Sequence, residues 1–409
     1  MKKKRIKPSP RFFRGMTAIF SALLILTGSI RTVAFDWKDK VNEMLGVSSE
    51  GVKRSQNPDD YIYLSDYDTA AELVEAEIGL ATRIQAEGTV LLKGTAEAGG
   101  TNVTLFGMRS LKMQYGGTMG GKVSEKQCVS LADALTEYGF SVNPVMQQFY
   151  MDMTQTYTPG NAAGATNIDT NTGTTVNEVP VSEYTQTQED SYDTYSDAAI
   201  IVLGRDSSEG SDYYPGAEGI ADADEFSGSP TGNILGLSDD ERELIAYVES
   251  QGFGKVIVLI NSGSAMELEE LDMDDSVDTI MWIGNPGCYG TYGIAQILSG
   301  GVLPSGHLAD TYAVNSALSP AAVNYGAYTF TNAADIDSSP NDALRSSWYL
   351  AELEGIYIGY KYYETRYYDT VTGAGNASEA AHGETADGKD VWNYIAVSTG
   401  PAWKILQSL

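Results

Sequence analysis

One carboxylate, Glu209, lies in a loop whose composition suits chemistry. The loop Gly204-Arg-Asp-Ser-Ser-Glu-Gly-Ser-Asp212 follows the apolar run Ala198–Leu203 directly. Six apolar residues ended by glycine predict a buried parallel strand. Because open α/β sheets hold their active sites at the carboxyl ends of such strands, Glu209 is the leading candidate for chemistry. The alternative is a solvated loop acid without a catalytic role.

A second candidate is the glycine-rich turn Gly116-Gly-Thr-Met-Gly-Gly-Lys122. Its glycine and lysine spacing matches a phosphate-binding P-loop, but Val123 occupies the position that must place a hydroxyl on magnesium. The preceding predicted strand is also not adjacent. A glycine turn near a sugar pocket is therefore favoured, and nucleotide binding is kept as a weaker alternative.

Other residue types exclude several chemistries. The chain has two cysteines, Cys128 and Cys288, far apart in the sequence, and two histidines, His307 and His382. This composition argues against a disulfide scaffold, a histidine-rich metal site and a Ser-His-Asp triad. The acidic run 268–275 follows no EF-hand spacing. No metal and no cofactor are expected.

The charge distribution is uneven along the 409 residues. The first 35 residues hold eight Lys or Arg and no acid, so 18 basic residues face 55 acidic ones in the remainder. A body this acidic repels nucleic acid and anionic lipid, whereas neutral ligands such as sugars are compatible with it. The hydrophobic fraction of 42% is sufficient for one large domain or two smaller ones.

The N-terminal segment, residues 1–35, has the pattern of a targeting sequence. A basic cluster precedes the apolar run Met16–Ile30. The pattern predicts a signal sequence or an uncleaved membrane anchor, with the basic flank inside and the body exported. Localisation is therefore expected to be secreted or on the outer face of the cytoplasmic membrane.

Hydrophobic periodicity predicts the elements that must position the candidate residues. A helix is expected over 70–86, and apolar runs predict strands at 88–92, 103–106, 140–142, 198–203, 255–260 and 277–283. Helices are expected between several of them, including one opened by the capping box Ser238-Asp-Asp-Glu241. We predict an α/β fold: a mainly parallel six-stranded sheet with helices on both faces. Residues 151–191 are expected to be an elaborated surface connection, with partial disorder as the alternative.

An ordered set of short motifs resembles glycoside hydrolase family 3, in particular the α/β-sandwich domain of its β-glucosidase-like members. The motifs are 87–93 (EGTVLLK), 115–117 (YGG), 209–212 (EGSD), 258–264 (VLINSGS), 282–287 (WIGNPG) and 304–306 (PSG). The resemblance implies that Glu209 is the general acid/base. It also implies that Asp212, Tyr115, Gly116 and Gly117 contact a β-glucoside or oligosaccharide.

The resemblance also implies a barrel domain carrying an aspartate nucleophile, and no such motif occurs in this chain. The expected organisation is 1–35 signal or anchor, 36–69 exposed lead-in, 70–369 sandwich domain and 370–409 linker and divergent tail. The tail from Ile395 lacks the pattern with which similar members continue, as after a truncation or frameshift. The expected function is hydrolysis of β-glucosides by a retaining mechanism, with a downstream or separate barrel as partner. The alternative is an exported carbohydrate-binding module without catalysis.

Overall fold

The computed structural model describes residues 13–23, 27, 65–117, 121, 123–161, 174–206, 233–316, 328–337, 348–349 and 355–365. The chain divides into two compact units, Met1–Ala70 and Ala71–Leu409. The sheet, its helices and the candidate site all belong to the second unit. Within the described residues, no helix combines the length and the apolar character needed to cross a membrane.

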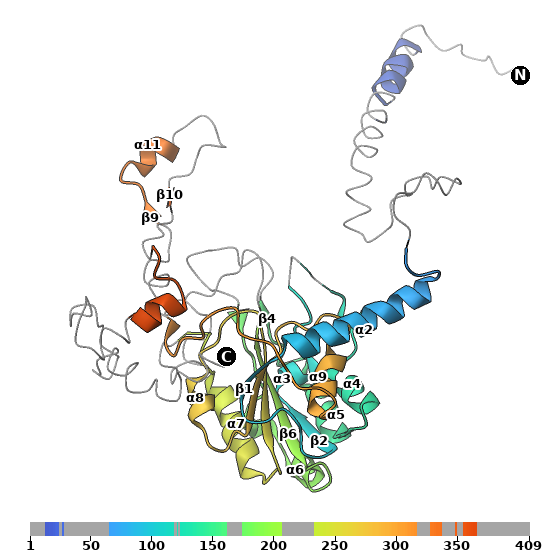
Figure 1. Cartoon of the computed structure of the whole chain (residues 1–409). Coiled ribbons are helices and arrows are strands. Elements are labelled where there is room, and N and C mark those ends of the chain that lie inside the picture. Colours follow the sequence, from blue (N-terminus) through green and yellow to red (C-terminus); the bar gives the residue numbers. More distant parts are fainter. Residues whose placement is uncertain are drawn as a thin grey trace, which may run out of the picture. The chain divides into compact units, whose positions relative to one another are not determined.

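A six-stranded sheet forms the centre of the second unit, as predicted (Figure 1). Its strands, in chain order, are β1 Val90–Lys93, β2 Asn102–Phe106, β3 Ser141–Val142, β6 Ala198–Arg205, β7 Val256–Ser262 and β8 Thr279–Trp282. The spatial order is β1-β8-β7-β6-β2-β3. All neighbours pair in parallel except β1, which runs antiparallel to β8 at one edge. Short ribbons pair β4 (Gly160–Asn161) with β5 (Thr174–Thr175) and β9 (Tyr328–Thr329) with β10 (Trp348–Tyr349).

The two central strands, β6 and β7, are buried along their whole length. Seven residue pairs join them in register, from Ala199 opposite Val256 to Arg205 opposite Ser262. Continuous apolar sequence is required here because helices cover both faces of a parallel sheet. The carboxyl ends of β6 and β7 consequently lie side by side, and this places their polar residues together.

Helices cover both faces of the sheet. One hydrophobic core lies between the sheet and helices α2 (Ala70–Gly88), α4 (Leu131–Glu137) and α9 (Thr291–Leu298). The other lies against α5 (Pro144–Met153), α6 (Gln186–Tyr192), α7 (Asp239–Ser250) and α8 (Glu269–Met273). Figure 1 shows α7 and α8 on the opposite side from α2 and α9. Alternate β6 side chains enter the two cores, Ile200 in the first and Ile201 in the second.

Side-chain caps explain where several helices begin. Ser238 and Glu241 form the predicted capping box, which opens α7 at Asp239. Ser130 accepts a hydrogen bond from the Asp133 N–H and begins α4. A short 3₁₀ turn, η2 (Glu125–Gln127), precedes α4, and the two do not form one continuous helix. The Ser130 cap accounts for this break, because an N-cap residue adopts non-helical backbone angles.

The region 151–191 differs from the surface connection expected there. Residues 162–173 lie outside the described part, but the segment that follows contributes to the core. Glu178 and Val179 are buried, a 3₁₀ turn η3 spans Val181–Glu183, and α6 begins at a Thr185 capping box. The high Thr, Asn and Gly content of the region concealed the buried residues Val176, Glu178 and Val179.

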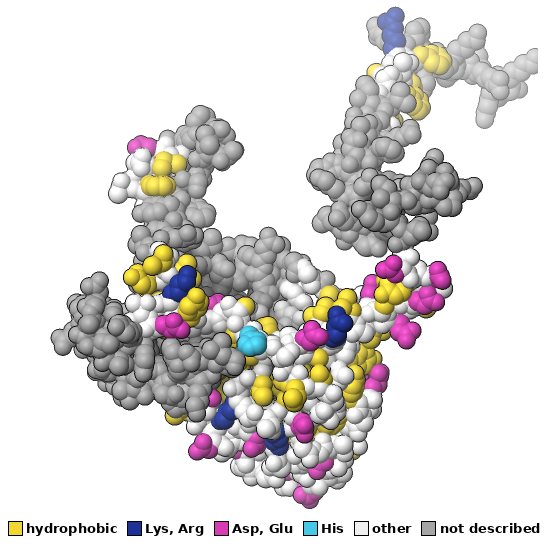
Figure 2. All heavy atoms as spheres, viewed as in Figure 1, with side chains coloured by type: hydrophobic (Ala, Val, Ile, Leu, Met, Phe, Trp, Pro, Cys, Tyr) yellow, Lys and Arg dark blue, Asp and Glu magenta, His cyan; other side chains and the backbone are white. Residues whose placement is uncertain are grey.

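The described surface is predominantly acidic, in keeping with the composition. Figure 2 shows acidic side chains spread over the visible face, with fewer basic ones. Helix α2 also leaves large apolar side chains exposed, namely Leu73, Val74, Leu80 and Ile84. Only Ala86 of this helix is buried.

Candidate active-site edge

The candidate site is the sheet edge where β2, β6, β7 and β8 end. Their carboxyl ends continue into Gly107, Asp206, Gly263 and Ile283, respectively. Because neighbouring parallel strands end at the same edge, residues far apart in the sequence meet here. The start of the Glu209 loop, at the end of β6, and the Tyr115–Gly117 turn are therefore held at the same edge. Strand β7, which pairs with β6, connects them.

Asp206 is the last described residue before the Glu209 loop. Its carboxylate pairs with Arg109 of helix α3 (Met108–Leu111), with 2.9 Å between Oδ1 and Nη1. Both side chains are less than a tenth exposed. Arg109 also donates to the Lys112 carbonyl at 3.3 Å. This buried ion pair fixes the start of the loop to helix α3.

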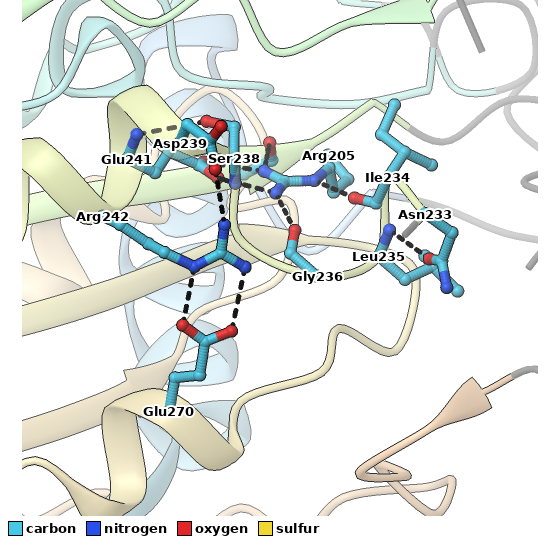
Figure 3. Close-up of polar contacts among 11 residues, drawn as sticks. Arg205, Asn233, Ile234, Leu235, Gly236, Ser238, Asp239, Glu241, Arg242 and Glu270 are labelled. Carbon is cyan, nitrogen blue, oxygen red and sulfur yellow. Dashed lines mark hydrogen bonds and ion pairs between the residues drawn. The ribbon is translucent and has the colours of Figure 1, made fainter. Parts of the chain in front are cut away.

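Glu209 and Asp212, the predicted acid/base and its neighbour, lie outside the described residues. Their loop can still be located through its ends, since β6 ends with Arg205 and the chain is described again from Asn233. Arg205 contacts both ends (Figure 3): it donates to Gly204 O at 2.9 Å and to Gly236 O at 2.5 Å, and also to Ile234 O. One buried guanidinium therefore ties the departing and returning strands of the loop together.

Glu241 neutralises that guanidinium. Its two carboxylate oxygens accept from Nη1 and Nη2 of Arg205, each at 2.8 Å. Each side chain is only 1% exposed. The fork of an arginine fits a carboxylate in this bidentate way, which gives a strong and directional ion pair. The return of the loop is also held by the Glu267 N–H, which donates to Leu235 O at 2.8 Å.

The Tyr115–Gly117 turn is held at the same edge by Asn261 of β7. The Asn261 side chain accepts from the Gln114 N–H at 2.7 Å and donates to the Gln114 and Gly284 carbonyls at 3.0 and 2.6 Å. The Gly287 N–H donates to the Tyr115 carbonyl at 2.7 Å. These bonds fix the turn to the ends of both β7 and β8.

Tyr115 is buried, with 8% of the residue exposed. Burial, followed by the nearby charges of Cys128 and Glu125, raises the pKa of its phenol. Gly116 is required by a close approach, because a Cβ there would lie 2.4 Å from the Gly121 carbonyl oxygen. The partly exposed portion of the turn is the backbone of Gly116 and Gly117. Their role in substrate binding stays a prediction.

The turn does not have the context of a P-loop. Strand β2 ends at Phe106, and helix α3 intervenes before Gly116. A P-loop needs its glycine-rich segment between a strand and a helix that begins at once. After the turn comes the 3₁₀ segment η2, and then α4. The structure therefore favours the glycine-turn interpretation over the nucleotide-binding alternative.

Within the described ranges, no three or more His, Cys, Asp or Glu side chains are grouped to hold a metal ion. The edge instead carries buried ion pairs and amide hydrogen bonds. Sequence analysis did not identify Arg109, Arg205 or Asn261 as site residues. A usable signal existed for the last two, because each lies at the polar end of a fully apolar strand.

Comparison with known proteins agrees with this architecture. The family model for the glycosyl hydrolase family 3 C-terminal domain matches residues 89–360. The chain is 26% identical over 305 residues to Beta-glucosidase A of Butyrivibrio fibrisolvens, covering 71% of this chain and 33% of that protein. It is 26% identical over 291 residues to a Beta-glucosidase of Ruminococcus albus, covering 70% and 26%.

A solved structure is also similar, that of beta-glucosidase 3B from Thermotoga neapolitana in complex with glucose. The TM-score is 0.51 at 25% identity, and the match covers 73% of this chain and 37% of that chain. This chain thus spans about a third of the length of the β-glucosidases it matches.

Proposed function

This chain belongs to glycosyl hydrolase family 3 through its C-terminal-type domain, and from that membership we propose that it serves hydrolysis of β-glucosides. In this proposal Glu209 is the general acid/base, and Asp212 with the Tyr115–Gly117 turn contacts the sugar. The nucleophile comes from a barrel domain, downstream or separate.

The observation that carries the proposal is the anchoring of the Glu209 loop at the sheet edge. Asp206 is buried in an ion pair at the end of β6, and Glu209 follows three residues later. Three residues of fully extended chain span at most about 11 Å, so the Glu209 Cα stays within that distance of Asp206. This limit from chain connectivity is compatible with the role proposed for Glu209 at the sheet edge.

The chemistry requires a second carboxylate. In a retaining glycosidase two carboxyl groups about 5 Å apart divide the work: one attacks the anomeric carbon and the other exchanges protons. Glu209 would protonate the leaving oxygen in the first step and deprotonate water in the second. A domain that contributes only one of the two groups needs its barrel to turn over substrate.

The test combines the full chain with a family barrel domain and follows chromogenic β-glucosides. Glu209→Gln retains size but removes the titrating proton. We expect it to slow poorly activated glucosides by on the order of a hundredfold or more. Substrates with good leaving groups should lose less in the bond-breaking step, and azide should rescue turnover by attacking the glycosyl intermediate without a base.

Asp212→Asn is the matched control, since it changes a carboxylate three residues further along the same loop. It should weaken binding without the leaving-group dependence or the azide rescue. If Glu209→Gln left both substrate classes unaffected while Asp212→Asn abolished turnover, the assignment to Glu209 would be incorrect.

A carbohydrate-binding module without catalysis is the second candidate, favoured by the partly exposed Gly116 and Gly117, whose backbone can contact a sugar without any nucleophile. The two functions separate in one comparison. Binding of oligosaccharide by the chain alone, with no turnover when a barrel is added, supports the module. Turnover that appears only with the barrel supports the hydrolase.

Export is part of the same proposal. Its support is the basic cluster before the apolar run of residues 16–30, together with exposed apolar side chains in the helical residues 13–23, including Phe13, Ile19, Phe20 and Leu23. A reporter enzyme fused after residue 35 should be recovered outside the cytoplasm. Recovery of all its activity inside the cytoplasm would contradict export.

A further inference from the structure

Two thiols separated by 160 residues of sequence meet beside the candidate site. The Sγ atoms of Cys128 and Cys288 lie 3.3 Å apart, and both residues are free and only partly buried. Cys128 precedes α4, whereas Cys288 lies in the loop between β8 and α9. Their separation in the sequence gave no indication of this contact.

Backbone contacts hold the two cysteine-bearing segments together. The Val129 N–H donates to the Cys288 carbonyl at 2.9 Å, and the Thr291 hydroxyl donates to the Val129 carbonyl at 3.0 Å. Helices α4 and α9 also contribute to the same hydrophobic core. The approach of the thiols is thus set by the fold on both sides and does not depend on the thiols themselves.

The same segments support the Tyr115–Gly117 turn. Gly287, the neighbour of Cys288, donates its N–H to the Tyr115 carbonyl at 2.7 Å. Both thiols lie within electrostatic range of the Tyr115 phenol. Any covalent link between the thiols would therefore restrain the loop on which this turn rests.

We propose that Cys128 and Cys288 form a disulfide bond. The bond would covalently join the segment before α4 to the segment before α9, next to the Tyr115–Gly117 turn. The oxidant is a low-molecular-weight disulfide. Bond formation brings the sulfur atoms from contact distance to about 2.05 Å. This proposal is independent of the assignment of Glu209 and of the proposed hydrolysis.

The reaction balances as two thiol–disulfide exchanges. The Cys288 thiolate attacks the oxidant, forms a mixed disulfide and releases one small thiol. The Cys128 thiolate then attacks the Cys288 sulfur and displaces the second small thiol. The protein loses two protons and two electrons, and the oxidant is reduced to two thiols.

The environment of Cys128 favours this order. Burial raises the pKa of the Cys128 thiol to about 12, and its contact with Cys288 adds to the shift. A raised pKa lowers the fraction of Cys128 that is present as thiolate, the nucleophilic form, which suits Cys128 to the second, intramolecular step. Once Cys288 is in a mixed disulfide it carries no charge, so the part of the shift that it causes is removed before the second step.

The test uses the purified full chain, treated with oxidised glutathione and compared with the reduced protein. After alkylation under denaturing conditions and digestion, non-reducing mass spectrometry should show the Cys128 peptide linked to the Cys288 peptide. Cys128→Ser and Cys288→Ser, which each retain one thiol, should give at most a glutathione adduct. Wild-type protein with both thiols alkylated, with two glutathione adducts, or linked between chains would overturn the proposal.

A thermal melt supplies an independent measurement. A crosslink that closes a loop this long restrains the unfolded chain, so oxidation should raise the Tm by roughly 10 °C. The Cys128→Ser/Cys288→Ser double variant should show no difference between the same two treatments. An oxidised wild type that melts at the temperature of the reduced protein would also overturn the proposal.

Discussion

Arg205 and Glu241 form a buried bidentate ion pair, with both nitrogen–oxygen distances at 2.8 Å. Arg205 ends strand β6, and Glu241 lies in the first turn of α7, so the pair spans the segment that carries Glu209. The same guanidinium donates to the carbonyls of Gly204 and Gly236. Figure 3 shows how these contacts converge on one side chain.

The first prediction concerns the charge of that pair. Glu241→Gln keeps an acceptor for the Ser238 N–H but removes the negative charge that pairs with the buried Arg205 guanidinium. Removing one partner of a buried ion pair costs about 3–5 kcal/mol. Urea denaturation should show a free energy of unfolding lowered by that amount.

Glu270→Gln is the control for this measurement. Glu270 of α8 pairs with Arg242 of α7 at 2.7 Å, but the Glu270 side chain is 37% exposed. Exposed pairs contribute about 1 kcal/mol or less, so this variant should remain close to the wild type. If both variants lost the same free energy of unfolding, burial would not be the reason that the Arg205–Glu241 pair stabilises the fold.

The second prediction concerns the amide that holds the glycine turn. Asn261→Ala leaves the Gln114 N–H, the Gln114 carbonyl and the Gly284 carbonyl without their present partner at a buried site. Buried polar groups without partners are costly, and we expect about 3 kcal/mol of destabilisation in urea denaturation. In an enzyme reconstituted with a barrel, KM should rise more than kcat falls, because the turn is displaced.

Gln148→Ala provides the comparison for Asn261→Ala. Gln148 is exposed and its side-chain amide donates to Asp152 at 2.7 Å on the same helix, so its loss should change stability by about 0.5 kcal/mol or less. An Asn261→Ala protein with wild-type stability and an unchanged KM would show that the turn does not depend on this amide.

The sheet could be predicted from sequence because its strands are unusually clear. Each of the six predicted runs coincides with an observed strand, and β6 was placed to within two residues. Their short length, their β-branched residues and the turn residues that flank them distinguish these apolar runs from buried helix segments. The antiparallel pairing of β1 with β8 could not be predicted, since no local pattern in the four residues Val90–Lys93 records the direction of a neighbour.

The site was less accessible to prediction, for a different physical reason. Arg205 looks like an ordinary loop charge in sequence, and its burial depends on Glu241 returning 36 residues later. Cys128 and Cys288 likewise meet only because α4 and α9 pack in one core. Motifs identify residues along the chain, whereas these pairs arise from long-range packing.

The last prediction concerns the pH dependence of stability through Glu178. This carboxyl group is fully buried, and its oxygens accept from the Met108 and Val179 N–H groups at 2.9–3.0 Å. Burial raises the pKa of Glu178 from 4.5 to about 8, against the opposing effect of those hydrogen bonds. A group whose pKa is raised on folding contributes its full stability below the unfolded pKa and loses it as pH rises through the folded pKa. The free energy of unfolding should therefore fall between about pH 4.5 and 8, by up to about 5 kcal/mol.

Asp240 and Glu249, whose pKa values are also raised by burial, act in the same direction. Glu178→Gln, which mimics the protonated form, isolates the contribution of Glu178: urea denaturation across this pH range should show a distinctly smaller slope than the wild type. Identical slopes in the two proteins would contradict a proton on Glu178 in the folded state.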